Sequence, residues 1–290
     1  MNNADPSIKP YVRELQTRCL QEGGFSRPDA VAWAILALRA AGETPDLVLK
    51  AQKRLMTNQA TDGRISLDAG HPGAFWPTAL AVLAWQGSAA FENARARAVA
   101  FLLQCTGTHW PRKKGSPIAH DTNIKGWSWT ADTHAWVQPT ALALIALRSA
   151  GYHDHERVLE GKRLLLDRQL PDGGWNYGNT RVFGKILRPM PACTAMALGA
   201  LAMTVPETIV TVSLQYLKEA IKTIRSPLSL GWGVLALSAW GNRPPAAFSW
   251  IVEALQRQQR YGLFDTALLS LLLVAFFEPD CLTQAMGESP

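Results

Sequence analysis

The sequence has few charged residues and few cysteines for its length. Asp, Glu, Lys and Arg make up 18% of the 290 residues, which is low for a globular protein. The four cysteines lie far apart in the chain: Cys19, Cys105, Cys193 and Cys281. They form no C-x-x-C pair, which argues against a zinc knuckle or a disulfide framework and favours a reducing compartment.

The sequence also lacks a long hydrophobic run and a leader segment. Its most apolar stretch, Thr266–Phe277, has about 12 residues, whereas a membrane-spanning helix needs about 20. The first residues, MNNADPSIKP, do not contain the apolar segment of a signal peptide. We therefore expect a cytoplasmic protein with a single domain over residues 1–290.

Apolar and aromatic residues are plentiful in comparison. Hydrophobic residues make up 48% of the chain, and the eleven tryptophans stand out because Trp usually packs against or binds something specific. A net charge of +6 would suit an anionic partner such as a diphosphate or an acidic lipid surface, so peripheral membrane contact stays open. Basic residues are spread along the chain apart from Arg112-Lys113-Lys114, which favours solvated helix faces. No nucleic-acid partner is predicted.

One pattern recurs along the chain: a helix tail with Gln, a short turn with Gly, and an apolar or aromatic residue. The clearest copy is Gln169-Leu-Pro-Asp-Gly173-Gly-Trp175. Further copies begin at Gln21, Gln59 and Gln259, and a looser one runs from Gln104 to Trp110. Gly supplies the left-handed backbone that ends a helix, and the Gln amide can bond the free terminal carbonyls. We expect the aromatic residue to pack over the turn, so Trp175 is predicted to be structural.

Each tail is followed by a second kind of segment that is apolar on nearly all sides. The six segments begin at Pro28, Pro77, Pro139, Pro191, Pro227 and Asp265. Such segments indicate helices buried on every side, and proline is favoured in the first helical turn. Amphipathic helices are expected between them, for example Asp46–Met56, Glu92–Leu103 and Val212–Ile224. The alternation predicts an all-α fold whose six inner helices close into a ring.

The stretch GKRLLLDRQLPDGGW resembles the QW motif of squalene–hopene and oxidosqualene cyclases. The openings WPTALAVLAW and QPTALALIAL resemble those of prenyltransferase/squalene-oxidase repeats, and the resemblance covers nearly the whole chain. It implies an (α/α)6 toroid of six inner and six outer helices around a central apolar cavity. This is the fold of the terpenoid cyclase-like superfamily, which includes protein prenyltransferase β subunits. One such scaffold hosts several chemistries, so the resemblance predicts the fold better than the reaction.

The D-x-D-D-T-A motif that carries the acid of these cyclases is absent from the sequence. When the chain is aligned on Thr-Ala, Gln138 occupies the position of the acid, and the segment beginning at Trp76 has no carboxylate there. Only the sixth inner segment keeps a carboxylate, Asp265, which is also a good helix N-cap. If acid catalysis survives, Asp265 or Asp132 is the expected proton donor.

The connector 107–135 is far longer than a link between helices needs to be and is a candidate lid. Its residues Asp132 and His134 allow three interpretations. A solvated loop with local turns is favoured, followed by a substrate-contacting acid/base pair and then by a metal site with His120 and Asp121. Cys193 lies at the start of an inner segment but has no D-x-C partner, so we expect a core cysteine rather than a zinc ligand. No metal and no cofactor are predicted.

The leading hypothesis is therefore a cyclase-like enzyme that processes an isoprenoid or polycyclic lipid in the central cavity, with Asp132, Asp265 and His134 as catalytic candidates. Residues on or beside the inner helices are candidates for substrate binding, the aromatic ones through cation–π contacts: Trp33, Trp76, Trp129, Trp136, Gln138, Tyr177, Trp232, Trp240 and Phe264. The alternative is a non-catalytic toroid that binds a lipid or a protein. A further alternative is a diphosphate-using prenyl transferase that relies on the basic triplet at Arg112. The substrate and the oligomeric state stay open.

Overall fold

The computed structural model describes residues 6–20, 27–43, 45–112 and 115–286. This part of the chain is mostly helical, and its two strands, β1 (Arg181–Val182) and β2 (Lys185–Ile186), form one short hairpin. The all-α class expected from the sequence is therefore confirmed. Within the same ranges, no helix is both long and apolar enough to cross a membrane.

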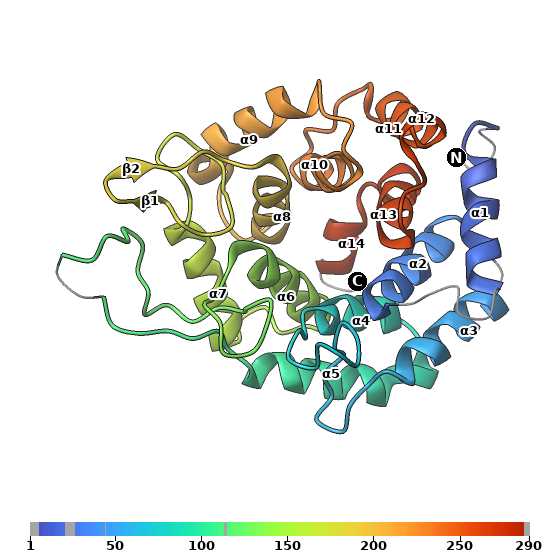
Figure 1. The fold of residues 1–290 in the computed structure, drawn as a ribbon, viewed down its shortest axis with the longest axis horizontal. Helices are drawn as coiled ribbons and strands as arrows, with labels where there is room; N and C mark the ends of the chain where they lie inside the picture. The colour runs from blue at the N-terminus through green and yellow to red at the C-terminus, as the bar shows by residue number, and fades with distance from the viewer. Residues whose placement is uncertain (1–5, 21–26, 44, 113–114, 287–290) are drawn as a thin grey trace.

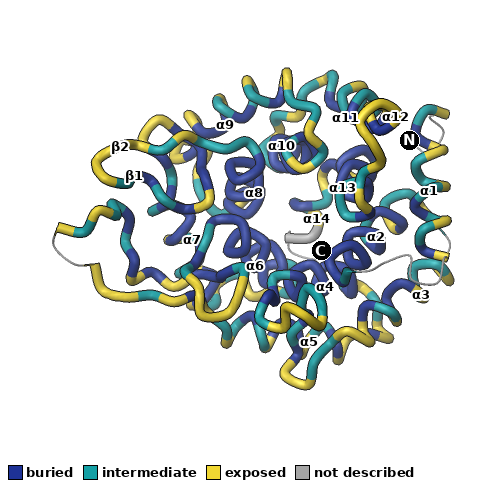
Figure 2. Tube along the Cα trace, viewed as in Figure 1, coloured by how far each residue is buried: buried dark blue, intermediate teal, exposed yellow. Residues whose placement is uncertain are grey.

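Six helices of the described chain form its buried centre, and we call them the inner helices. They are α2 (Pro28–Ala40), α4 (Pro77–Trp85), α6 (Val137–Ser149), α8 (Pro191–Leu201), α10 (Pro227–Ala239) and α13 (Thr266–Phe277). Each contacts the next in this order, and α13 contacts α2, so the contacts run in a closed cycle. Figure 1 shows these helices around the middle of the molecule, and Figure 2 shows that they are buried over most of their length.

The starts of the inner helices follow the expectation from the sequence closely. Four of them begin at the expected prolines, which are Pro28, Pro77, Pro191 and Pro227. Proline suits this place because the first N–H groups of a helix have no partner within it. Helix α6 begins two residues before Pro139, and Asp265 is the N-cap of α13, where its carboxylate accepts the Leu268 N–H at 2.8 Å.

A second set of helices packs around the inner ones. These outer helices are α1 (Lys9–Leu20), α3 (Pro45–Met56), α5 (Glu92–Gln104), α7 (Glu156–Asp167), α9 (Glu207–Ile221) and α11 (Ala247–Gln256). The remaining helical segments are η1 (Ala89–Phe91), α12 (Gln258–Tyr261) and α14 (Cys281–Met286). The expected start of α9 at Val212 is wrong: the buried stripe of this helix already begins at Val210 and continues through Leu214, Leu217 and Ile221.

The turn at Trp175 ties an outer helix to the next inner helix. The Trp175 ring is fully buried, and its N–H donates to the Leu165 carbonyl of α7 at 2.7 Å. Its backbone N–H donates to the Thr194 hydroxyl of α8 at 2.9 Å, and this hydroxyl lies 3.2 Å from the Trp175 carbonyl, to which it donates. Thr194 stands in the first turn of α8, so the contacts fix how α8 begins relative to α7.

The same arrangement occurs in the third copy of the pattern, but with Trp127 instead of the expected Trp110. The Trp127 ring N–H donates to the Leu102 carbonyl at 2.9 Å, and its backbone N–H donates to the Thr140 hydroxyl at 3.0 Å. The expectation for Trp110 is wrong because the connector makes an excursion within the turn. Both ends of this excursion are joined by a hydrogen bond of 2.8 Å from the Gly107 N–H to the Gly126 carbonyl.

The glutamines of the turns reach further than expected. Gln169 does not cap its own helix, because its amide donates to the Ser213 hydroxyl at 2.8 Å and the Ile209 carbonyl at 3.3 Å, both on α9. A polar side chain at the end of one outer helix thus holds the next outer helix in place.

The last copy of the turn uses Gln258, whereas the sequence pattern was assigned to Gln259. The Gln258 amide donates to the Leu255 carbonyl at the end of α11 at 3.2 Å, and its oxygen accepts the Phe264 N–H at 2.7 Å. This copy therefore shows the expected bond to a terminal helix carbonyl. The copy expected at Gln21 lies outside the described residues.

Candidate functional site

A cavity of about 230 Å³ lies at the end of the molecule where the inner helices begin, and we call it the N-terminal cavity. All six inner helices contribute to its wall. Four tryptophans line it: Trp33, Trp76, Trp129 and Trp232. They meet edge to face in two pairs, Trp33 with Trp232 at 5.7 Å between ring centroids and Trp76 with Trp129 at 5.3 Å.

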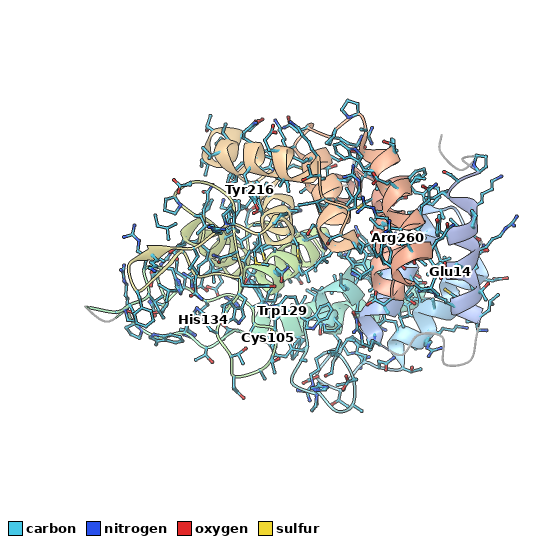
Figure 3. The ribbon with its side chains drawn as sticks, turned by 45° about the horizontal axis from the view of Figure 1, so that its top comes forward. Glu14, Cys105, Trp129, His134, Tyr216 and Arg260 are labelled. Carbon is cyan, nitrogen blue, oxygen red and sulfur yellow. The ribbon has the colours of Figure 1, made fainter. Side chains whose placement is uncertain are left out.

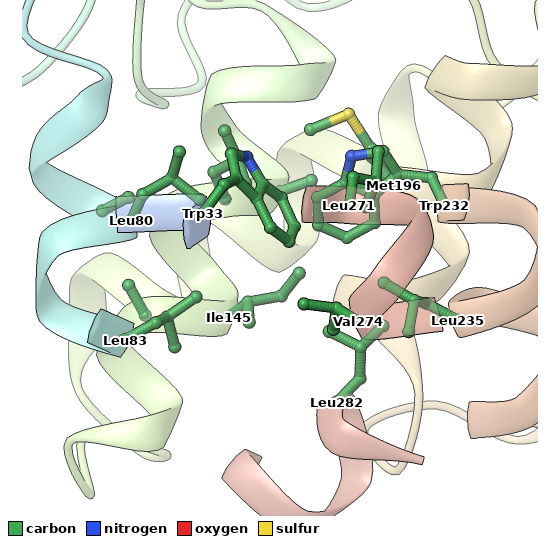
Figure 4. Close-up of a cluster of buried hydrophobic side chains, with 14 of the residues drawn as sticks. Trp33, Leu80, Leu83, Ile145, Met196, Trp232, Leu235, Leu271, Val274 and Leu282 are labelled. Atoms are coloured by element: carbon green, nitrogen blue, oxygen red, sulfur yellow. The ribbon is translucent and has the colours of Figure 1, made fainter. Parts of the chain in front are cut away.

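The local sequence explains why these side chains converge. Trp33 stands five residues after the proline that begins α2, and Trp232 stands five residues after the proline that begins α10. The two rings therefore lie at equivalent depths along their helices. Trp76 is the N-cap of α4, and the connector brings Trp129 against it. Figure 4 shows one layer of side chains that contains Trp33, Leu80, Met196, Trp232 and Leu271, each from a different inner helix. Gln138 also lines this cavity.

An ion pair lies at the polar side of the N-terminal cavity. The Arg27 guanidinium donates two hydrogen bonds to the buried Asp29 carboxylate, from Nε at 3.0 Å and from Nη2 at 2.8 Å. Asp265 lies beside this pair, with its Oδ2 3.9 Å from Arg27 Nη2. The sequence analysis missed Arg27 and Asp29. The available signal was a single carboxylate, Asp29, in the first turn of an otherwise apolar helix.

These contacts engage both carboxylates at the cavity. Asp29 accepts two bonds from Arg27, and Asp265 accepts the backbone N–H that starts α13. This side of the cavity therefore offers an ion pair and hydrogen-bond acceptors.

Asp132 and His134 do not lie among the described residues that line this cavity. Asp132 is exposed in a tight turn with a positive φ of 61°. The backbone of His134 pairs with that of Thr108, and Figure 3 labels His134 and Trp129 in different parts of the view. Its imidazole instead contacts Trp136, with 5.8 Å between ring centroids. The expectation that Asp132 and His134 face the cavity together is not met.

Three other candidate residues have contacts elsewhere. Tyr177 is 49% exposed, and its carbonyl accepts the Val137 N–H at 2.9 Å. Trp240 ends α10, and its ring N–H donates to the Leu198 carbonyl at 2.9 Å. Phe264 lies against Gln258 in the last turn. With Trp136, these residues are absent from the described wall of the N-terminal cavity, so their binding roles stay predictions.

A second cavity, of about 330 Å³, lies toward the ends of the inner helices, and we call it the C-terminal cavity. Its apolar wall forms the other layer in Figure 4, made of Leu83, Ile145, Leu235, Val274 and Leu282. Trp33 and Trp232 line both cavities, so this pair stands between them. Leu282 belongs to α14, which lies near the middle of the molecule in Figure 1 and helps to line this cavity.

Metal ligands and reactive thiols are not prominent in the structure. Within the described ranges, no group of three or more His, Cys, Asp or Glu residues is placed to hold a metal ion. Cys193 is fully buried in α8, and burial raises the pKa of its thiol to about 12. A thiol with such a pKa is a weak nucleophile and a weak ligand at neutral pH.

Comparison with known proteins adds no family to this description. Neither models of known protein families nor the curated proteins give a match to the sequence. The functional interpretation therefore depends on the chemistry of the two cavities.

Proposed function

We propose that the chain is an (α/α)6 toroid that binds an isoprenoid or polycyclic lipid in its central cavities. The closed cycle of contacts among the inner helices supports the toroid, together with an outer helix packed against each part of that cycle. The turns at Trp127 and Trp175, which link outer to inner helices in the same way, also support it. The turn at Trp175 carries the resemblance to the QW motif.

The observation that carries the functional proposal is the convergence of four tryptophans on the N-terminal cavity. Their rings come from four segments that are distant in the sequence, and the rest of the wall is mainly apolar. Removing apolar surface from water contributes about 25 cal/mol per Å², so an apolar ligand gains most where such walls surround it. Flat aromatic faces also suit the fused rings or conjugated double bonds of isoprenoid lipids.

The contacts and positions of the candidate acid residues favour binding over acid-initiated cyclisation. Gln138 occupies the position of the acid, and a carboxamide is not a useful proton donor. Asp29 is held by Arg27, and Asp265 caps α13. Asp132, the other candidate, lies in an exposed turn. The diphosphate-using alternative relies on a basic triplet of which only Arg112 is described.

A binding titration tests the proposal directly. Dansyl-labelled farnesol would be added to the protein, and energy transfer from tryptophan to dansyl would report binding. We expect saturation, and competition by unlabelled farnesol. Ala267→Phe would place a ring in the N-terminal cavity and should weaken binding at least about tenfold, or 1.4 kcal/mol.

Ala100→Phe is the matched control because Ala100 is an exposed residue of the outer helix α5. This variant should bind like the wild type. Equal binding by all three proteins, or a signal that does not saturate, would contradict binding in the N-terminal cavity.

A second candidate function, cyclisation, is favoured by one observation: Asp265 lies at a cavity whose aromatic rings could stabilise a carbocation. The test is product formation from squalene, followed by gas chromatography and mass spectrometry. If the wild type turns squalene over, Asp265→Asn should abolish turnover while keeping the helix cap, since Asn caps as well as Asp. Asp132→Asn should leave turnover unchanged. No product from the wild type would remove this candidate.

A further inference from the structure

Several buried nitrogen atoms beside the connector have no hydrogen-bond partner in the described structure. They are both ring nitrogens of His120, Nε2 of His134, and Nε and Nη2 of Arg168. His120 is 2% exposed and Arg168 is 1% exposed. Buried polar groups are nearly always hydrogen-bonded, and a buried guanidinium is especially costly to leave unsatisfied. These three side chains therefore mark a place where a ligand would satisfy several donors at once.

Arg168 is held rigidly by one side of its guanidinium. Its Nη1 donates to the Asp121 carbonyl at 3.1 Å and pairs with the Asp167 carboxylate. The same carboxylate accepts the Asp121 N–H at 3.0 Å, so the end of α7 and the connector are joined through this ion pair. The unpartnered Nε and Nη2 form the other side of the guanidinium. Two parallel donors of this kind bind the oxygens of a carboxylate or phosphate in a bidentate manner.

The two histidines lie next to one another, and His120 directly precedes Asp121, whose carbonyl accepts from Arg168. Their rings are stacked with 5.5 Å between centroids, and Trp110 contacts His134 at 5.0 Å. Burial lowers the pKa of His120 to about 3, and the positive charge of Arg168 adds to this effect. Burial also lowers the pKa of His134. At neutral pH each imidazole is therefore neutral and carries one N–H donor. In His134 this donor is Nδ1, which lies 3.3 Å from the Thr108 carbonyl, so its Nε2 is an acceptor and the free ring N–H of the pair belongs to His120.

The charge of the cluster selects the kind of ligand. Two neutral imidazoles could hold a metal cation, but the guanidinium charge beside them opposes cation binding. Arg112 lies near enough to lower the pKa of His120 as well, which adds to the positive potential. Asp167 and Asp121 are engaged on the far side, with Arg168 and with the exposed Arg163. An anion is the ligand whose charge and acceptor oxygens match the unpartnered donors of Arg168 and His120.

We propose that Arg168 and His120, with His134 stacked on His120, form a binding site for an oxyanion, specifically a phosphate group. Arg168 donates two hydrogen bonds through Nε and Nη2, and His120 donates one from its ring. None of the three residues lines either of the two cavities described above, so the site is separate from the lipid site and does not depend on it. The phosphate group could be free inorganic phosphate or the head group of a phosphorylated lipid.

The first test measures inorganic phosphate binding to the full chain. Phosphate at roughly ten times its Kd should raise the Tm by about 2 °C, compared with chloride at the same ionic strength. The ring resonances of His120 and His134 should shift in NMR spectra, and both should saturate at the same Kd. An unchanged Tm together with unshifted histidine rings would overturn the proposal.

Two variants test the donors. Arg168→Lys keeps the positive charge but removes the bidentate pair, so the Kd for phosphate should rise at least about tenfold. Arg163→Lys is the matched control on the same helix, because Arg163 is largely exposed, and its Kd should stay unchanged. Should Arg168→Lys not fold, His120→Phe removes the free ring N–H donor while keeping a ring against His134, and it should raise the Kd about threefold to tenfold. A wild-type Kd in the folded variants would contradict the site.

A second arm identifies the source of the phosphate group. Farnesyl diphosphate, farnesol and inorganic phosphate would be compared through the His120 ring resonances. If farnesyl diphosphate binds at least tenfold more tightly than inorganic phosphate, the site takes the head group of a lipid. If the two bind equally, the site takes free phosphate. Farnesol alone should not shift the His120 resonances, and a shift equal to that caused by the diphosphate would argue against an oxyanion site.

Discussion

Single tryptophans in this molecule divide into those that hold the fold and those that line a cavity. Trp175 belongs to the first kind, since its ring is fully buried and its N–H bonds a helix-end carbonyl. Trp175→Ala should lower the free energy of unfolding by about 3–5 kcal/mol, as truncation of a buried aromatic does. Chemical denaturation measures this change. Trp110→Ala is the control, because Trp110 is 39% exposed and should cost about 1 kcal/mol or less. Unchanged stability with loss of lipid binding would assign Trp175 to the ligand instead.

His120 links stability to pH. The folded protein keeps His120 neutral down to about pH 3, whereas the unfolded chain binds a proton near the ordinary pKa of 6.5. Between these values the unfolded state holds more protons, so the free energy of unfolding falls as the pH falls below 6.5. The slope should approach about 1.4 kcal/mol per pH unit by pH 5. Arg168, Arg112 and His134 act in the same direction as burial on this pKa, and Asp121 opposes them.

Urea denaturation of the wild type and His120→Gln between pH 7.5 and 5 measures this slope. The variant should lose most of it. Parallel curves for the wild type and His120→Gln would show that His120 is already charged in the folded protein.

The sequence allowed some residues of the candidate site to be predicted and not others. Trp33, Trp76 and Trp232 could be predicted because a tryptophan at the start of an all-apolar helix generally points to the centre of the fold. Arg27 and Asp29 could not be predicted, since a carboxylate at the start of a helix is usually interpreted as a helix cap. Their pairing depends on the tertiary approach of the segment before α2.

At the scale of elements, a threonine hydroxyl links three of the described turns to the next inner helix. The pairs are Ile65 with Thr78, Trp127 with Thr140, and Trp175 with Thr194. Thr194→Val keeps the shape but leaves the buried Trp175 N–H without an acceptor. It should lower the free energy of unfolding by about 1–3 kcal/mol in chemical denaturation. Thr211→Val, on the exposed face of α9, should change it by about 0.5 kcal/mol or less. Equal effects of the two substitutions would show that the link adds no stability.

Helix positions were largely predictable, and the connector was not. Prolines mark the starts of four inner helices, and continuous apolar runs mark their length. The connector has no such periodicity, so the looser copy ending at Trp110 gave the wrong aromatic residue. Gly126 and Trp127 complete the turn only because the Gly107–Gly126 hydrogen bond closes the excursion between them.

At the scale of the whole molecule, the closed cycle of inner helices encloses two cavities separated by Trp33 and Trp232. The wall is mainly apolar on both sides of this pair, and the carboxylates at one end are engaged in an ion pair and a helix cap. The proposed toroid therefore suits an apolar ligand.

The measurement that tests this account most directly is mass spectrometry of the lipid that the purified protein retains. Wild-type protein and the Ala100→Phe control should release the same isoprenoid or polycyclic lipid, close to one molecule per chain. Ala267→Phe, with a ring placed in the N-terminal cavity, should release at least about tenfold less. Equal lipid from all three proteins, or no lipid from a wild type that also fails to take up added farnesol and squalene, would contradict the account.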